Sequence, residues 1–190
     1  MHRLSVIGAL SLVAATAHAQ DYSGPYIGVS VGSFDYTEFD DQLGVVIEDS
    51  TSAYRLIGGY QVNESLAIEA GVGKTGDIKE SFPLGPLGSG SLDVKAEYEL
   101  VTVRALGLVP LDSIDFFGGI GYYDATVNVA ATATGFGSVI DAAEDDSGLT
   151  LLGGVQFYLD NMTIRGEYEW FNTDSDLEVW DISVGVLFRF

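Results

Sequence analysis

Hydrophobic residues alternate one by one with small or polar residues along much of the chain. Ile27, Val29 and Val31 are aliphatic, and glycine or serine stands between them. Successive side chains of a β-strand point to opposite faces of a sheet, so this alternation predicts strands with one apolar face. No segment beyond the first twenty residues has a sustained helical period. Eight segments alternate in this way: 26–34, 53–62, 66–73, 94–109, 114–123, 148–159, 162–171 and 179–190.

The connections between these segments alternate in length. Short ones lie at 63–65, 111–113 and 160–161, whereas the others are longer and cover 35–52, 74–93, 124–147 and 172–178. Outer-membrane barrels have short periplasmic turns and long external loops, and strands of about 9–11 residues cross the bilayer. The pattern therefore predicts an all-β protein, an eight-stranded antiparallel up-and-down transmembrane β-barrel.

The two faces of each predicted strand suit two kinds of barrel. One face is aliphatic or aromatic, and the other carries glycine, small residues or charges such as Glu69 and Arg165. A soluble ligand-binding barrel of lipocalin type would turn the apolar face inward. A membrane barrel would turn it toward lipid and keep the charges in a narrow lumen. We favour the membrane barrel, because the segregation of loop lengths accompanies it.

The first nineteen residues have the features of an export signal. Arg3 precedes an apolar run over 4–15, and Ala17-His18-Ala19 fits the small-x-small cleavage pattern. The run is shorter than the roughly 20 residues of a spanning helix, which argues against an uncleaved anchor. We predict a signal peptide at 1–19 and a barrel domain at 20–190, located in the outer membrane of a Gram-negative bacterium.

Composition excludes several kinds of chemistry. The chain has no cysteine, and its two histidines, His2 and His18, both lie in the predicted signal. Catalytic sites and metal sites that depend on histidine are thereby excluded from the mature chain. We predict no catalytic residues, no metal site and no cofactor. The net charge of −20 argues against a nucleic-acid partner, because phosphate binding requires clustered lysine and arginine.

Acidic residues are concentrated in two of the long connections. Residues 35–49 contain six acidic residues and no basic one, and 141–146 contain four. Neither stretch has the spacing of an EF-hand calcium loop. The pattern predicts a solvated, mutually repelling surface. Weak bridging by divalent cations to the phosphates of neighbouring lipopolysaccharide is an alternative, and a specific calcium site is another.

Five segments resemble the small eight-stranded outer-membrane β-barrel family typified by the transmembrane domain of OmpA and by OmpX-like proteins. They are YIGVSVG at 26–32, GGYQVN at 58–63, GGVQF at 153–157, RGEYEW at 165–170 and SVGVLFRF at 183–190. The long connections match nothing in that family. The resemblance implies an outer-membrane barrel, and because the last strand ends at Phe190 we expect no periplasmic peptidoglycan-binding domain.

The resemblance also implies a network of opposite charges that plugs the lumen. Glu69 and Arg165 match two of its members by position and Arg104 lies near a third, whereas Ser30 replaces a lysine and Gln156 a glutamate. An ionised group in a narrow lumen is costly unless it is paired, which is consistent with a plug. The predicted interior network comprises Arg55, Glu69, Arg104, Arg165 and Glu167, and Glu169 faces the same arginines.

Aromatic residues near strand ends suit the two membrane interfaces. The predicted girdle contains Tyr26, Tyr60, Phe116, Tyr122, Tyr168, Trp170, Trp180 and Phe190. The resemblance further implies that Phe188 and Phe190 form a C-terminal signal recognised by the outer-membrane barrel assembly machinery.

The expected function is therefore structural: envelope integrity or surface interaction by a plugged barrel in contact with outer-membrane lipid and lipopolysaccharide. An eight-stranded barrel is just wide enough for side chains to fill it. Two alternatives remain open. One is a narrow channel. The other is a lipid-modifying enzyme, which would need one of Lys74, Lys79 and Lys95 as its base, and no serine–lysine signature accompanies them.

Overall fold

The computed structural model describes residues 23–40, 45–83, 91–111, 113–133, 137–159, 161–173 and 177–190. The predicted signal peptide lies outside these residues. No helix in the described part of the chain is long and apolar enough to span a membrane. The described residues form nine strands: β1 (Gly24–Asp40), β2 (Val45–Asn63), β3 (Leu66–Thr75), β4 (Ile78–Pro83), β5 (Ser91–Leu111), β6 (Ile114–Ala133), β7 (Gly137–Leu159), β8 (Met162–Asn172) and β9 (Leu177–Arg189).

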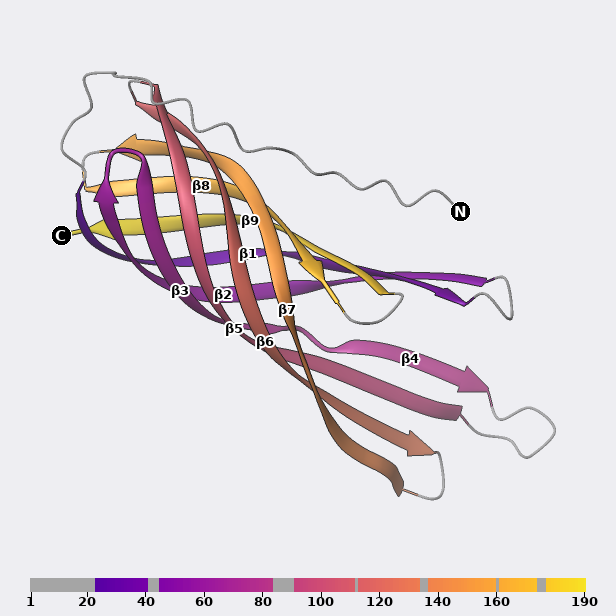
Figure 1. Ribbon diagram of the computed structural model, residues 1–190. Coiled ribbons are helices and arrows are strands. Elements are labelled where there is room, and N and C mark those ends of the chain that lie inside the picture. Colours follow the sequence, from indigo (N-terminus) through magenta and orange to yellow (C-terminus); the bar gives the residue numbers. More distant parts are fainter. Residues whose placement is uncertain are drawn as a thin grey trace.

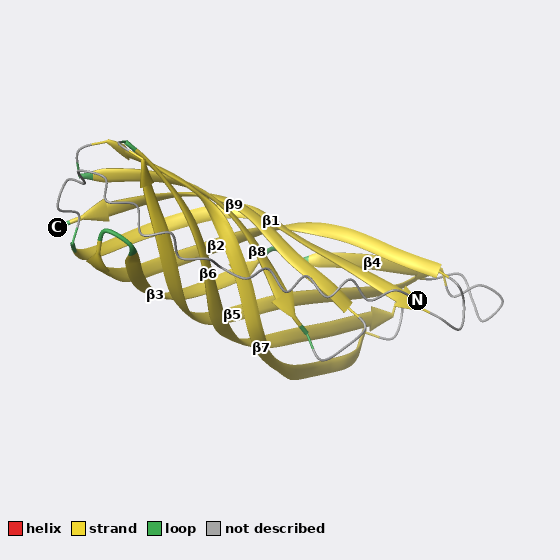
Figure 2. Cartoon of the chain, turned by 45° about the horizontal axis from the view of Figure 1, so that its top comes forward, coloured by secondary structure: helices red, strands yellow, loops and turns green. Residues whose placement is uncertain are grey.

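The strands close into one antiparallel barrel, with the strands tilted around its axis (Figures 1 and 2). The sheet order is β3-β2-β1-β9-β8-β7-β6-β5-β4, and additional pairing of β3 with β5 completes the ring. β1 and β9 pair from Tyr26↔Arg189 to Glu38↔Leu177, which joins the two ends of the described chain. β4 follows β3 after a break and continues along β5, so eight strands make up the wall. The predicted fold class is confirmed.

The apolar face of the strands points outward. Ile27, Val29 and Val31 are 45–56 % exposed, whereas Tyr26 and Phe34 are buried in the interior. β3 and β6 show the same two-residue alternation of exposed and buried positions. A lipocalin-type arrangement with the apolar face inward is therefore wrong. The outer belt of large hydrophobic side chains suits contact with hydrocarbon.

The predicted long loops are largely strand. β1 and β2 remain paired out to Asp40↔Val45, and β6 and β7 out to Ala133↔Gly137. These hairpins project from the end opposite the C-terminus, and the short turns lie at the C-terminal end (Figure 1). The alternation that predicts a strand reports burial of one face, not backbone pairing, and the signal is weaker in these extensions, where small and charged residues are frequent.

Candidate functional site

Strand geometry brings the predicted charged residues to one level of the lumen. Arg165, Glu167 and Glu169 lie at alternate positions of β8, so their side chains share its inner face. Glu69 of β3 lies directly opposite Arg104 of β5 in the register. With Arg55 of β2, these are six charged side chains, and all of them are buried. We call these six residues the charged cluster.

Arg104 connects the three carboxylates of the charged cluster. Its Nη2 lies 2.7 Å from Glu69 Oε2, and its Nη1 lies 2.5 Å from Glu167 Oε1 and 3.3 Å from Glu169 Oε2. Arg165 Nη1 lies 2.6 Å from Glu69 Oε1. Arg55 Nη1 lies 2.6 Å from Glu169 Oε2 and 3.2 Å from Glu167 Oε1. Each carboxylate therefore contacts at least two guanidinium groups.

The charged cluster is balanced, because it contains as many arginines as glutamates. Removing an ion from water costs several kcal/mol in a protein interior, and only good pairing offsets this cost. Glycines in the wall make room for the long side chains. A Cβ on Gly121, for example, would lie 2.7 Å from Thr150 Oγ1 and 2.9 Å from Arg104 Cγ. The cluster thus fills the lumen at its own level.

A second polar group lies toward the end with the short turns, and of its members the sequence analysis had named only Gln156 as part of the lumen network. Gln156 Oε1 accepts hydrogen bonds from Arg165 Nε at 3.3 Å and Nη2 at 3.0 Å, and its Nε2 donates to Asp115 Oδ2 at 3.2 Å. Tyr158 also donates to Asp115. Inward alternation on β6 and β7 was the available signal for these three residues. The amide at position 156 holds Arg165 without adding a fourth carboxylate to the balanced set.

Arg189 completes this second group. Its Nη1 donates to Gln61 Oε1 at 2.7 Å and its Nε to Thr163 Oγ1 at 3.1 Å. The guanidinium lies over the rings of Tyr26 and Tyr158, with its carbon 5.3 and 5.0 Å from the ring centroids. Arg189 is half-buried, and cation–π contacts of this kind stabilise its guanidinium group.

Tyr26 corrects the predicted aromatic girdle. Its side chain is only 3 % exposed, and its hydroxyl donates to Glu69 Oε1 at 2.5 Å. Position 26 alternates with the outward residues 27 and 29, so the pleat turns it inward although it lies near a strand end. Gly59 leaves space for its ring, since a Cβ there would overlap it. Of the predicted girdle, Tyr60, Phe116, Tyr122, Tyr168 and Phe190 are exposed on the outer face.

The two C-terminal aromatic residues lie on the outside of the barrel. Phe188 is 45 % exposed and Phe190 is 81 % exposed. The backbone N–H of Phe190 donates to Pro25 O at 3.2 Å, which holds the chain end against β1. Both rings are therefore accessible at the end with the short turns.

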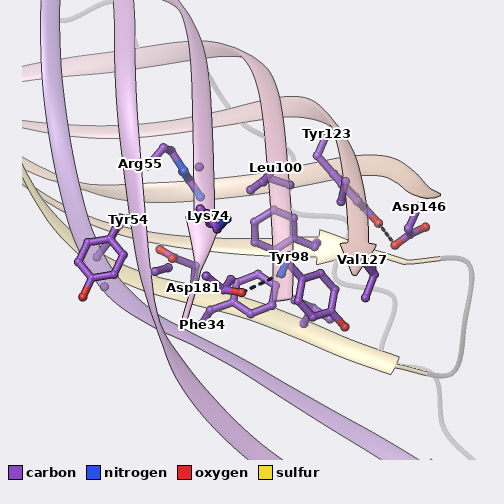
Figure 3. Close-up of a pocket in the computed structure, with 18 of the residues that line it drawn as sticks. Phe34, Tyr54, Arg55, Lys74, Tyr98, Leu100, Tyr123, Val127, Asp146 and Asp181 are labelled. Atoms are coloured by element: carbon purple, nitrogen blue, oxygen red, sulfur yellow. Dashed lines mark hydrogen bonds between the residues drawn. The ribbon is translucent and has the colours of Figure 1, made fainter. Parts of the chain in front are cut away.

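A cavity of about 440 Å³ lies beyond the charged cluster, toward the projecting hairpins (Figure 3). Its apolar lining includes Phe34, Tyr98, Leu100, Phe171 and Val179. Neighbouring rings pack closely, with Phe34 and Tyr98 centroids 5.4 Å apart. We call this space the vestibule. The sequence analysis did not predict it, because its lining residues come from different strands that meet only when the barrel closes.

Charged side chains lie at both ends of the vestibule. Arg55 and Asp181 line it on the side of the charged cluster, and Glu144, Asp145 and Asp146 line it from β7. Tyr123 donates to Asp146 Oδ2 at 2.9 Å. Among the side chains that the structure describes, no three histidine, cysteine or acidic groups are arranged to hold a metal ion. Most side chains of the acidic stretch 35–49 lie outside the described residues.

Comparison with known proteins identifies relatives of the whole barrel. The family described as "Outer membrane protein beta-barrel domain" matches residues 5–190. The crystal structure of Ail from Yersinia pestis, bound to the heparin analogue sucrose octasulfate, is 18 % identical with a TM-score of 0.58, covering 88 % of this chain and 99 % of that chain. No curated protein sequence matches the chain significantly.

Two further solved barrels are similar in fold. Neisserial surface protein A is 15 % identical with a TM-score of 0.59, covering 88 % of this chain and 98 % of that chain. The N-terminal barrel domain of Pseudomonas aeruginosa OprF is 13 % identical with a TM-score of 0.52, covering 90 % and 100 %. At these identities the likeness concerns the fold alone.

Proposed function

Because the chain belongs to the outer-membrane protein β-barrel family, we propose that it is a plugged, non-enzymatic barrel that anchors its hairpins at the bacterial surface. The outward apolar belt supports residence in the lipid bilayer. The projecting parts of β1–β2 and β6–β7 support a role outside the membrane, since they extend beyond the part of the wall that closes the ring.

The charged cluster is the observation that carries the proposal of a plug. Arg104 and Glu69 are each 1 % exposed, and the ion pairs join β2, β3, β5 and β8 across the lumen. A path for hydrated ions would require these pairs to separate, which leaves buried charges unpaired. General diffusion through the barrel is therefore not expected.

Planar-bilayer recording with the purified, folded protein tests the plug. We expect no steady conductance from the native barrel. Exchanging Arg104 and Glu167 together for alanine should create conductance, whereas Val103→Ala on the outer face of the same strand should not. Stepwise conductance from the native protein would contradict the plug and support the narrow channel.

The lysine residues give no support to an enzyme. Lys95, on the projecting part of β5, lies 2.8 Å from Asp77 Oδ1, and this hydrogen bond raises the pKa of the ammonium group. A general base needs the opposite shift. Lys74 lies 2.6 Å from Glu97 Oε1 and 3.4 Å from Glu99 Oε1. Lys79 belongs to β4, and its side chain lies outside the described set.

The acidic hairpins favour cationic or cation-bridged partners. Ail binds a heparin analogue, but this chain has a net charge of −20 and should repel polyanions. We propose that divalent cations bridge the hairpins weakly to lipopolysaccharide phosphates. Lipopolysaccharide binding measured with and without Mg²⁺ tests this: binding should fall after chelation, and binding that is indifferent to chelation would refute bridging.

A further inference from the structure

We propose that the vestibule binds a small organic cation, an amine or ammonium group carried on an aromatic or short aliphatic body. This inference goes beyond the plugged barrel, because it concerns the space outside the charged cluster. It rests on three independent features: an apolar wall, a buried carboxylate without a full set of partners, and an acidic entrance.

The wall of the vestibule suits an apolar body. Phe34, Tyr123, Phe171 and Val179 form one buried hydrophobic cluster, and Tyr98 and Leu100 pack against it. These residues come from β1, β5, β6, β8 and β9, so closure of the ring brings them together around the vestibule. The volume of about 440 Å³ is within the range of roughly 300–1,000 Å³ typical of small-molecule pockets.

The barrel wall is incomplete around the vestibule. β2 pairs with β3 only as far as Ala53↔Thr75, and β7 pairs with β8 only as far as Leu149↔Asn172. The hairpins β1–β2 and β6–β7 continue beyond these points. Ala53 and Thr75, the last paired residues of β2 and β3, both line the vestibule, so one of these two ends of strand pairing lies directly beside it.

Asp181 supplies the recognition group. It is 2 % exposed and lines the vestibule, and its Oδ1 has no hydrogen-bond partner among the described residues. Ser183 donates to the same carboxylate. The nearby charges are those of Arg55, Glu167 and Glu169. Arg55 is already paired with these two glutamates.

The charge balance explains why Asp181 requires a cation. The three arginines of the charged cluster are matched by its three glutamates, so Asp181 is a surplus carboxylate. A buried carboxylate without a counter-ion is unfavourable, and an ammonium group from a ligand would supply a positive charge and a donor for Asp181 Oδ1. The tyrosine and phenylalanine rings of the wall also favour a cation.

The entrance excludes anions. The acidic residues of β7 that line the vestibule are Glu144, Asp145 and Asp146. Thr126 Oγ1 donates a hydrogen bond to Asp145 Oδ1 at 3.1 Å. Lys74, the basic residue in the lining besides Arg55, is paired with Glu97 and Glu99. A negative entrance raises the local concentration of cations and repels carboxylate or phosphate ligands.

Calorimetric titration of the full, folded chain in detergent micelles tests the proposal. The probes are 2-phenylethylamine, the neutral analogue 2-phenylethanol and the anion 3-phenylpropionate, with empty micelles as the blank. We expect the amine to bind at least about tenfold more tightly than the alcohol, as expected when one charge-assisted hydrogen bond is lost, and the anion not to bind.

Two variants distinguish recognition of the amine in the vestibule from its partitioning into micelles and from misfolding of the protein. Asp181→Asn should reduce amine affinity about tenfold, whereas the same exchange at the exposed Asp124 of β6 should leave it unchanged. Leu100→Trp should fill the vestibule and abolish binding. A folded barrel migrates differently in gel electrophoresis before and after boiling, so this difference would show that the variant is folded. Equal binding of amine and alcohol, unchanged binding by Asp181→Asn, or no amine binding would each overturn the proposal.

Discussion

Glu69 contacts more partners than strand alternation alone indicates. It forms ion pairs with Arg104 and Arg165 and accepts a hydrogen bond from the Tyr26 hydroxyl. Side chains from three other strands therefore contact this one carboxylate. Pairwise contributions within such a network are not additive. Substitutions at this position should therefore reveal coupling that an exposed ion pair would not show.

The first prediction concerns the Glu69–Arg165 pair. Glu69→Gln and Arg165→Met should each destabilise the barrel by about 3–5 kcal/mol, because each leaves its partner buried and unpaired. The double variant should lose less than the sum of the two, with coupling of about 1–3 kcal/mol. Urea unfolding in detergent or lipid measures these values, and strictly additive losses would show that the pairing is wrong.

The second prediction concerns the inward tyrosine. Tyr26→Phe removes the hydroxyl that donates to Glu69 and should cost about 1–3 kcal/mol, because a buried carboxylate loses a donor. Tyr60→Phe is the matched control: Tyr60 lies on the outer face at 53 % exposure, and unfolding should change by less than about 0.5 kcal/mol. An equal effect of the two exchanges would contradict the lumen contact.

β9 connects barrel closure with the proposed assembly signal. It pairs with both β1 and β8, so the last strand completes the ring. An unpaired edge in hydrocarbon leaves backbone groups without partners, at several kcal/mol each. Phe188 and Phe190 lie on its outer side. The strand is needed for folding, whereas the exposed terminal ring is available for recognition.

The third prediction separates these two roles. Deleting Phe190 should cost less than the roughly 1.5–3 kcal/mol of a fully buried phenylalanine, because its ring is 81 % exposed, and the purified protein should still refold in detergent. In cells the same deletion should sharply reduce membrane insertion, as cell fractionation would show. Normal insertion would refute the targeting role, and failure to refold in detergent would instead assign a structural role to the residue.

The whole molecule has three kinds of surface in three separate places. An apolar belt surrounds a polar lumen, and acidic hairpins project at one end. This separation reconciles a positive mean hydropathy with a net charge of −20. An outer-membrane barrel is exported across the inner membrane, and the signal peptide predicted at 1–19 would direct this export.

The fourth prediction concerns that signal. The mature protein should begin at Gln20, because Ala17-His18-Ala19 fits the cleavage pattern. N-terminal sequencing of protein from the outer-membrane fraction measures this. The fraction should also contain a heat-modifiable barrel, which migrates differently before and after boiling. A mature chain that begins at Met1 would contradict cleavage.

Periodicity and connection lengths together predicted the wall of this barrel. The alternation placed Ile27 and Val29 on one face and Glu69 and Arg165 on the other, and in the structure the first face is exposed and the second is buried, because a strand in lipid must be apolar on one face. The alternating connection lengths predicted the up-and-down order, and the family match confirms the resemblance to outer-membrane barrels.

Tertiary structure decided which interior groups meet. Sequence does not specify strand stagger, so the contacts of Arg104 with three glutamates and of Tyr26 with Glu69 depended on closure of the ring. The hairpin extensions gave a weaker periodic signal, because backbone pairing outside lipid does not require a strongly apolar face. The vestibule arises from Phe34, Phe171 and Asp181 on different strands. Only the closed barrel brings these three side chains to one level, because side chains from different strands meet across a lumen only after the strands have joined.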